Sequence, residues 1–299
     1  MFQPVSCLCA AVLALGLLAP ASGAHAAPAH PPTAPKGASA QPGATAAAYQ
    51  RLLELSSLDL VLRQMPAYFQ LGLEQVKAQG VSLPPPVQAA FEAAAAEVLA
   101  PEQLRPSALA LLQTHLNDSQ LAEWLAFYRT PLGKKAAAAD QRAASPEFQA
   151  LLQNRAPQVM AKLSQDAGRM ALLQSWLQAT EAVEQSTDLM IQAQLGVAWG
   201  LAVALPGGAG VQSFDELKDQ MEAQRFSLNA QVAQALLVHM AVAYQDFSNK
   251  ELGQLLRLAN RPAGKAFYID FSRQISQLLS ARMEQLGHTI GRKLDTPAI

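Results

Sequence analysis

Apolar residues recur at three- and four-residue steps along most of the chain, beginning at Ala46. This spacing places apolar side chains on one face of an α-helix. The period of two that marks a half-buried strand does not occur over any comparable stretch, so the pattern predicts helices throughout. The clearest stripe lies near the C-terminus and consists of Phe267, Phe271, Ile275, Leu278, Leu279, Met283, Leu286 and Ile290.

The composition supports the same fold class. Alanine, leucine and glutamine are abundant, and these residues lose little side-chain freedom in a helix. Two segments begin with a serine three residues before a glutamate, the spacing of a capping box, in which the two side chains bind free backbone N–H groups reciprocally. These pairs are Ser213 with Glu216 and Ser248 with Glu251. The breaks between helices lie at residues 83–87, Pro101, Pro131, residues 145–146, residues 205–210 and Pro262.

The two halves of the chain align when Pro131 is placed on Pro262. In both copies an amphipathic helix, which starts at a capping pair (Asn117 with Gln120 in the first copy), leads into the sequence Pro-x-Gly-Lys. We interpret this pattern as an internal duplication. It predicts an all-α helical bundle of two tandem units, residues 46–168 and 169–299, each with a short helix, a corner and a long helix. The matched pairs are Leu121 with Leu252, Leu125 with Leu256, Pro131 with Pro262, Gly133 with Gly264 and Lys134 with Lys265.

The Gly-Lys pairs invite comparison with a phosphate-binding loop. Such a loop needs a second glycine five residues earlier, a hydroxyl residue after the lysine and a preceding strand, and both copies lack all three. We therefore interpret the motif as a tight corner in which proline starts the second helix and glycine admits a close backbone approach. Thr130 is expected to cap that helix in the first copy and Asn260 in the second. A duplicated anion site at the two lysines stays open as the alternative.

The first corner also resembles a known family. The stretch "FYRTPLGKK" within residues 112–136 is similar to the DUF2059 family, a domain of unknown function found mostly in exported bacterial proteins. The second stretch, residues 243–267, lacks the Phe-Tyr pair. The resemblance implies a small, all-helical, secreted protein, and it implies no activity and no catalytic residues.

The N-terminal residues indicate export. Residues 1–26 combine a short apolar run with an Ala-x-Ala site that ends at Ala26, as in a cleaved signal peptide. Residues 27–45 are rich in proline, alanine and glycine, which predicts a disordered tether. Cys7 and Cys9 would leave with the signal peptide, so the mature chain would be cysteine-free. We expect a periplasmic or secreted protein without disulfides.

Few residues suggest catalysis. The histidines form no His-Glu-x-x-His motif, no Gly-x-Ser-x-Gly elbow is present, and the acids of residues 215–222 have the spacing of a solvated helix face. We expect no cofactor and no metal. The formal net charge of −1 gives no reason to expect nucleic acid as a partner.

The apolar stretch of residues 189–205 has three interpretations. It is short and flanked by no basic residues, so membrane insertion of the mature chain is not expected. A central helix buried on all sides explains it better, with Gly196 and Gly200 allowing close contact with another helix. A groove for an apolar ligand is the third interpretation, and its lining residues would be Met190, Ile191, Val197 and Trp199.

These observations favour a non-enzymatic protein. We expect it to bind a protein partner or an apolar small molecule between its two repeats. The alternative is a hydrolase or lyase whose site is assembled from distant carboxylates and histidines.

Overall fold

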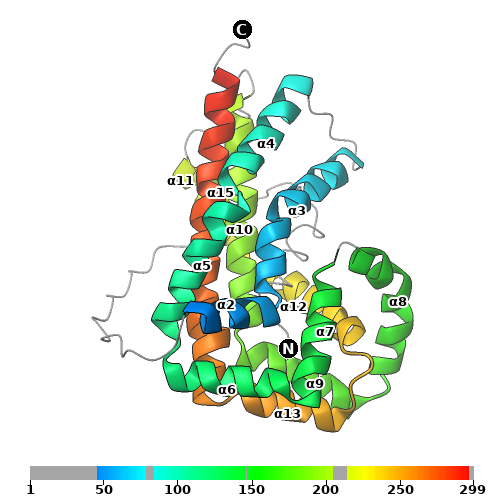
Figure 1. The fold of residues 1–299 in the computed structure, drawn as a ribbon. Coiled ribbons are helices and arrows are strands. Elements are labelled where there is room, and N and C mark those ends of the chain that lie inside the picture. The colour runs from blue at the N-terminus through cyan, green and yellow to red at the C-terminus, as the bar shows by residue number, and fades with distance from the viewer. Residues whose placement is uncertain (1–45, 79–83, 146, 205–213, 296–299) are drawn as a thin grey trace.

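The computed structural model describes residues 46–78, 84–145, 147–204 and 214–295 (Figure 1). Every regular element within these ranges is a helix, which confirms the predicted all-α class. The predicted signal peptide and tether lie outside the described residues. The elements are α2 (Ala46–Leu55), α3 (Leu58–Ala78), α4 (Pro85–Val98), α5 (Pro101–His115), α6 (Asp118–Arg129), α7 (Pro131–Ala143), α8 (Glu147–Leu163), α9 (Ala167–Ala179), α10 (Ala182–Ala204), α11 (Phe214–Ala223), α12 (Arg225–Ala243), α13 (Asn249–Ala259), α14 (Pro262–Lys265), the π-helical turn η2 (Ala266–Phe271) and α15 (Ser272–Asp295).

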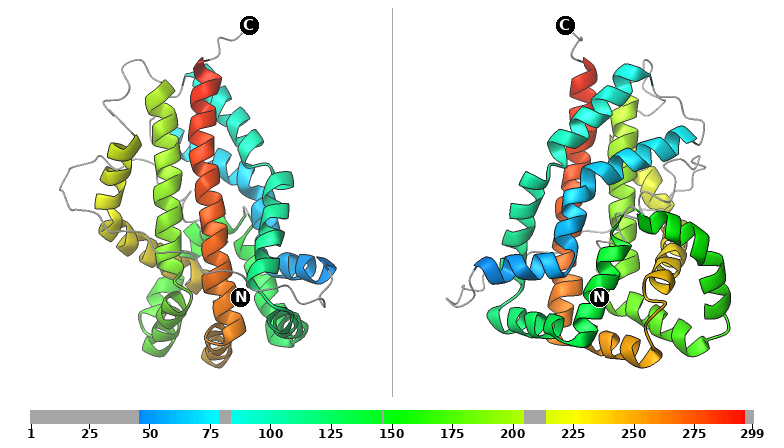
Figure 2. Two further views of the ribbon diagram at one scale, coloured as in Figure 1. Left: turned by 90° about the vertical axis from the view of Figure 1, so that its left-hand side faces the viewer. Right: turned by 45° about the vertical axis from the view of Figure 1, so that its right-hand side comes forward.

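The long helices α10 and α15 lie side by side and run in the same direction along the molecule (Figure 2). Their contact depends on two glycines. A Cβ atom at Gly196 would lie 2.4 Å from the carbonyl oxygen of Met283, and one at Gly287 would lie 2.5 Å from the carbonyl oxygen of Gly196. The predicted close helix contact at Gly196 is thus present, whereas the surroundings of Gly200 lie outside the described part of α10.

The other helices pack around this pair. Helices α4 and α5 lie along α15, α9 and α12 contact α10, and α8 packs on the outside of α12. Apolar side chains from both predicted units meet in one buried cluster, for example Phe91 and Trp124 from the first unit and Ile191 and Ile275 from the second. The division of the chain near residue 168 stays a prediction.

The C-terminal stripe is buried as predicted, and its only half-buried member is Leu278. The π-helical turn η2 adds one residue to the local turn, and the Ser272 hydroxyl donates a hydrogen bond to the Phe267 carbonyl at 3.0 Å. The wider turn brings both Phe267 and Tyr268 into the core, where neither is exposed.

Both predicted capping boxes at the short helices are formed. Asn117 pairs reciprocally with Gln120 at the start of α6, and Ser248 with Glu251 at the start of α13. The third predicted pair includes Ser213, which lies outside the described residues.

The helices after the two corners are capped differently. The backbone N–H of Gly133 donates to the Thr130 hydroxyl at 3.0 Å, as expected for a capped α7. The prediction that Asn260 caps the next helix was wrong. Its side-chain amide donates instead to the Leu256 carbonyl of the preceding helix at 3.0 Å, and Arg261 stands at the N-cap without a side-chain hydrogen bond. Asn260 still belongs to the end of α13, one residue too early to reach the free N–H groups of α14.

The two corner glycines occupy equivalent positions. A Cβ atom at Gly133 would lie 2.1 Å from the Phe127 carbonyl oxygen, and a Cβ atom at Gly264 would lie 2.1 Å from the Leu258 carbonyl oxygen. Each helix therefore begins directly against the last turn of the helix before it. Beyond the corners the copies differ, because α7 ends at Ala143 and the chain bends into α8, whereas α14 continues through η2 into α15.

Among the described helices, α12 alone is long and apolar enough to cross a membrane, judged by length and composition. Half of that apolar stretch is buried inside the bundle.

Alanine at either corner glycine tests the close approach. Gly133→Ala and Gly264→Ala should each lower the free energy of unfolding by about 1–3 kcal/mol, because the new methyl group overlaps a backbone carbonyl. Gly253→Ala in α13 is the matched control, since its Cβ would have no neighbour closer than 3.7 Å and alanine is the better helix former. Urea denaturation measures all three variants, and corner variants that match the native protein would show that the approach is not needed.

Candidate functional site

The two corners pack against each other at one end of the bundle. The indole N–H of Trp124 in α6 donates to the carbonyl of Ala263 in α14 at 3.0 Å. The Trp124 ring also lies 5.0 Å from the Phe267 ring and 5.6 Å from the Tyr268 ring, between centroids. At the surface, Arg261 forms an ion pair with Glu123 at 3.1 Å. The second corner therefore packs against α6, the short helix of the first corner.

A hollow of about 500 Å³ lies beside the first corner, where α2 meets α6 and the start of α7. Its walls are mostly apolar. The half-buried side chains of Leu55 and Leu125 and the buried Tyr128 supply most of the large apolar groups. The complete lining is Ala47, Ala48, Arg51, Leu55, Leu125, Tyr128, Arg129 and Lys134.

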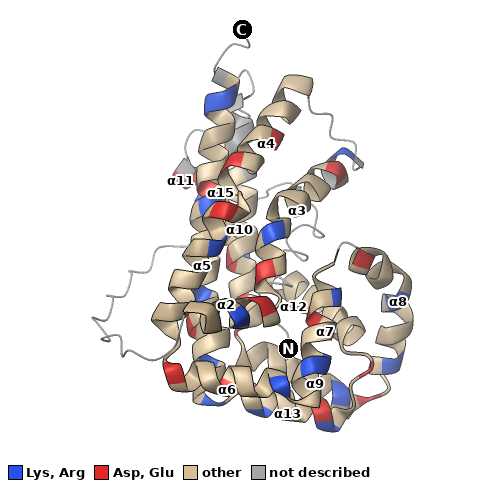
Figure 3. Ribbon diagram, viewed as in Figure 1, with Lys and Arg blue, Asp and Glu red and all other residues tan. Residues whose placement is uncertain are grey.

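All charged residues that line the hollow are basic. Arg51 forms an ion pair with Glu54 of the same helix, with 3.2 Å between the Arg51 Nη1 and Glu54 Oε2 atoms. Arg129 and Lys134 are exposed, and neither forms an ion pair with an acid in the part of the chain that the structure describes. Over the helices in the view of Figure 3, basic and acidic residues are intermixed. The hollow is thus a local concentration of positive charge.

Tyr128 connects the hollow to a buried polar group. Its side chain is 4% exposed, and its hydroxyl finds no hydrogen-bond partner among the described residues. Burial raises its pKa well above the ordinary value, and the nearby carboxylate of Asp140 acts in the same direction. The Tyr128 hydroxyl therefore stays protonated.

Asp140 lies in the core behind Tyr128, on the inner face of α7. It accepts a hydrogen bond from the Tyr244 hydroxyl of α12, 2.5 Å away. Burial raises the pKa of Asp140 to about 6, although the hydrogen bond from Tyr244 lowers it. Sequence reasoning missed this acid. The helical spacing of the sequence could have indicated its burial, because Asp140 follows Gly133 and Ala136 on the buried face of α7.

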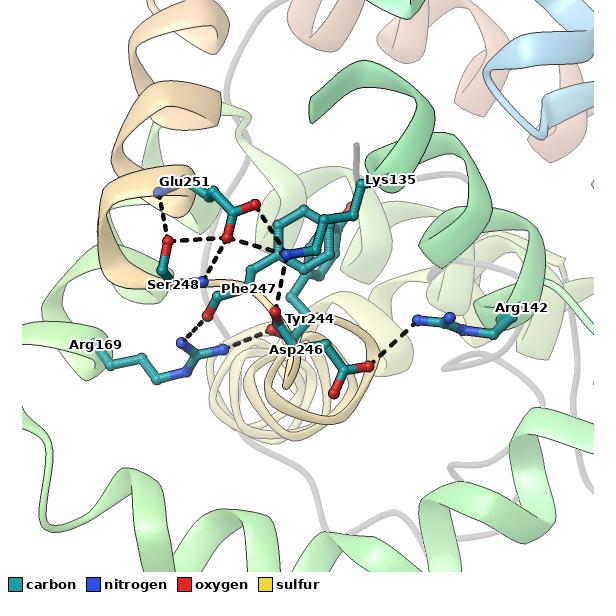
Figure 4. A network of polar contacts seen from close by, with 8 residues as sticks. All are labelled: Lys135, Arg142, Arg169, Tyr244, Asp246, Phe247, Ser248 and Glu251. Atoms are coloured by element: carbon teal, nitrogen blue, oxygen red, sulfur yellow. Dashed lines mark hydrogen bonds and ion pairs between the residues drawn. The ribbon is translucent and has the colours of Figure 1, made fainter. Parts of the chain in front are cut away.

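A second polar network joins α7 to the loop before α13 (Figure 4). The ammonium group of Lys135 lies 2.9 Å from a carboxylate oxygen of Glu251 and donates to the Asp246 carbonyl at 2.9 Å. It also stands 4.4 Å from the centroid of the Phe247 ring, a cation–π distance. The hydrogen bond from Lys135 lowers the pKa of Glu251 to about 2, and the hydrogen bonds from the backbone and hydroxyl of Ser248 act in the same direction.

Arg169 of α9 holds the same loop from the other side. Its guanidinium donates to the carbonyls of Tyr244 and Phe247, both at 2.6 Å (Figure 4). The network therefore satisfies backbone carbonyls that no helix uses, and its role is to fix the loop between α12 and α13.

The residues that the sequence suggested for an apolar groove, all in α10, are not among those that line the hollow. Met190 and Ile191 are almost completely buried in the apolar cluster, and Trp199 is half-buried. The side chain of Val197 lies outside the described part of the structure. In the corner motif Lys134 lines the hollow, while Pro131, Gly133, Pro262 and Gly264 shape the corners and Lys265 is exposed at the second one.

The histidines and acids considered from sequence do not assemble. His239 is buried against the Phe148 ring, 4.7 Å between centroids, and burial lowers its pKa to about 3. Glu222 of the acidic stretch is paired with Arg225 at 2.6 Å. Across the described residues, no group of three or more histidine, aspartate or glutamate side chains has the arrangement of a metal site.

Comparison with known proteins extends the sequence resemblance. Residues 102–162 match a family model described as an uncharacterized protein conserved in bacteria, DUF2059. We refer to this matched segment as the DUF2059 region. It runs from α5 to α8 and carries the first corner, which supports the resemblance noted from "FYRTPLGKK". Searches of curated proteins and of solved structures found no match. The second corner lies outside the DUF2059 region, so the internal duplication stays a prediction.

Adjacent lysines of the DUF2059 region should affect stability differently. Lys135→Ala removes the ion pair with Glu251 and the contact with Phe247, and should lower the free energy of unfolding by about 1 kcal/mol. Lys134→Ala removes an exposed side chain, and should change that free energy by no more than about 0.5 kcal/mol. Thermal denaturation of both variants at low and high salt checks the difference. Equal effects would contradict the separate roles assigned to the two lysines.

Asp140 should make stability depend on pH. Its pKa is raised from 3.8 to about 6 in the folded protein, so its contribution is complete below about pH 4 and is lost as the pH rises through 6. Asp140→Asn stays neutral, so between pH 4 and pH 7.5 the variant should gain up to about 3 kcal/mol relative to the native protein.

The comparison at each pH cancels the opposite contribution of His239, which both proteins share. Asp246→Asn, at an exposed carboxylate, is the matched control and should follow the native curve. Thermal midpoints measured across this pH range test the effect. Parallel curves for Asp140→Asn and the native protein would contradict it.

Proposed function

We propose that this chain is an exported, non-enzymatic helical protein that binds a small, largely apolar molecule in the hollow between α2, α6 and α7. The observation that carries the proposal is the hollow itself, with a volume of about 500 Å³ and mostly apolar walls. Pockets for small molecules commonly have this size and character. Leu125, Tyr128, Arg129 and Lys134 come from the DUF2059 region, so the recognisable segment of the chain supplies half of the lining.

The lining chemistry supports binding rather than catalysis. Nucleophilic or acid–base catalysis requires a nucleophile or base within hydrogen-bond distance of the reacting atoms. No carboxylate, histidine, serine, threonine or cysteine is among the residues that line the hollow. The Tyr128 hydroxyl stays protonated because burial raises its pKa, and Lys134 is exposed and is argued below to bind an anion.

The site differs in place from the seam between the repeats that the sequence suggested. Helices α6 and α14 are packed together in that seam through Trp124 and Phe267. The hollow lies beside the seam, on the outer side of the first corner. Export rests on the signal-peptide pattern of residues 1–26 and on the character of the DUF2059 resemblance.

Native mass spectrometry of protein purified from the periplasm of its own cells tests both parts of the proposal. We expect a chain that begins after Ala26 and carries a small molecule, which is lost on denaturation. A chain that retains Met1 in the cytoplasm would contradict export. Leu125→Trp, which fills the hollow, should abolish the bound mass, and retention of that mass by the variant would place the ligand elsewhere.

A further inference from the structure

We infer that the ligand of this hollow is an amphipathic anion, a short apolar chain with one carboxylate at its end, held by Arg129 and Lys134. The inference rests on the proposed function and specifies its ligand. It requires three features of the hollow: a positive charge without internal compensation, a position for the head group, and apolar lining residues for the chain.

The positive charge is not balanced within the site. Arg51, Arg129 and Lys134 line the hollow and no acid does so. Arg51 is paired with Glu54, whereas the described acids leave Arg129 and Lys134 unpaired. Cations held close together repel one another, and a bound anion removes that repulsion.

The position of Lys134 adds a second argument. It stands in the first turn of α7, a helix with no acid in that turn. The N-terminus of a helix carries a partial positive charge, so a lysine there is electrostatically unfavourable and an anion is favourable. Arg129, in contrast, stands at the C-terminal end of α6, where the helix stabilises a cation. Lys134 and the start of α7 therefore act together on an anion.

The apolar part of the lining consists of Leu55 and Leu125, which are half-buried, and the buried Tyr128. Leu55 lies one helical turn from Arg51, and Leu125 lies one turn from Arg129, so an apolar chain can follow the same helices that carry the cations. Leucine side chains that remain half-exposed without a ligand gain from contact with an apolar chain. A small inorganic anion would leave this apolar lining in water, and an apolar molecule without charge would leave the two cations unpaired.

The second corner provides a matched control. Lys265 stands at the position equivalent to Lys134, also after a proline and a glycine in the first turn of a helix. It is not among the residues that line the hollow. Loss of charge at Lys265 should therefore change the net charge of the protein by the same amount without affecting the ligand.

The test uses the mature chain and four probes: octanoate, 1-octanol, octylammonium and acetate. Calorimetric titration at pH 7.5 should show binding of octanoate, with 1-octanol about ten-fold weaker, since a hydrogen bond to a charged group contributes about one order of magnitude. Octylammonium and acetate should not bind measurably. Lys134→Gln and Arg129→Gln should each weaken octanoate about ten-fold and leave 1-octanol unchanged, whereas Lys265→Gln should match the native protein.

The outcomes separate the inference from the proposed function. If 1-octanol binds as tightly as octanoate, and Leu125→Trp abolishes both, the hollow is a binding site but the inferred anion selectivity is wrong. If octanoate binding is unaffected by both charge variants, the anion is held elsewhere and the inference is overturned. If no probe with an octyl chain binds, the proposed function fails together with the inference. Thermal midpoints near the native value for Lys134→Gln and Arg129→Gln establish that these variants are folded.

Discussion

The arrangement at the first corner depends on one close contact, between Gly133 and the carbonyl of Phe127. Because no side chain fits there, α7 starts directly against the last turn of α6. That start places Lys134 beside Arg129 and Tyr128, which together form one side of the hollow. One turn before Tyr128 on the same helix, Trp124 receives the second corner. A larger residue in place of Gly133 would separate the two helices and change both surfaces.

Polar contacts between distant segments hold the two predicted units in register. The Trp124 indole binds the Ala263 carbonyl, Lys135 binds Glu251, and Asp140 accepts from Tyr244. The first gives a partner to the buried indole N–H of Trp124, and the second pairs Lys135 with the glutamate of the capping box at the start of α13. The third places an acid in the core, which is unfavourable unless the acid is hydrogen-bonded or protonated. Burial raises the pKa of Asp140, and the hydrogen bond from Tyr244 acts in the opposite direction.

The hollow combines features that apolar packing alone does not require. A core position selects apolar side chains, and an ordinary surface mixes charges of both signs. Around the hollow, half-exposed leucines lie beside Arg129 and Lys134, which form no ion pair with a described acid. Lys134 also stands where the helix dipole disfavours it. This combination is the reason for proposing that the hollow binds a ligand.

The sequence by itself determined the features that depend on neighbours a few residues away. Helical class, the capping boxes at Asn117 and Ser248, and the buried C-terminal stripe follow from spacings of three and four residues, and all were predicted. The tertiary structure alone decided which helix covers which face. Periodicity shows that a face of α7 is buried, but not that Tyr244 meets Asp140 there or that α2 closes a hollow over Lys134. Those pairings join residues far apart in the chain, and packing geometry between helices selects them.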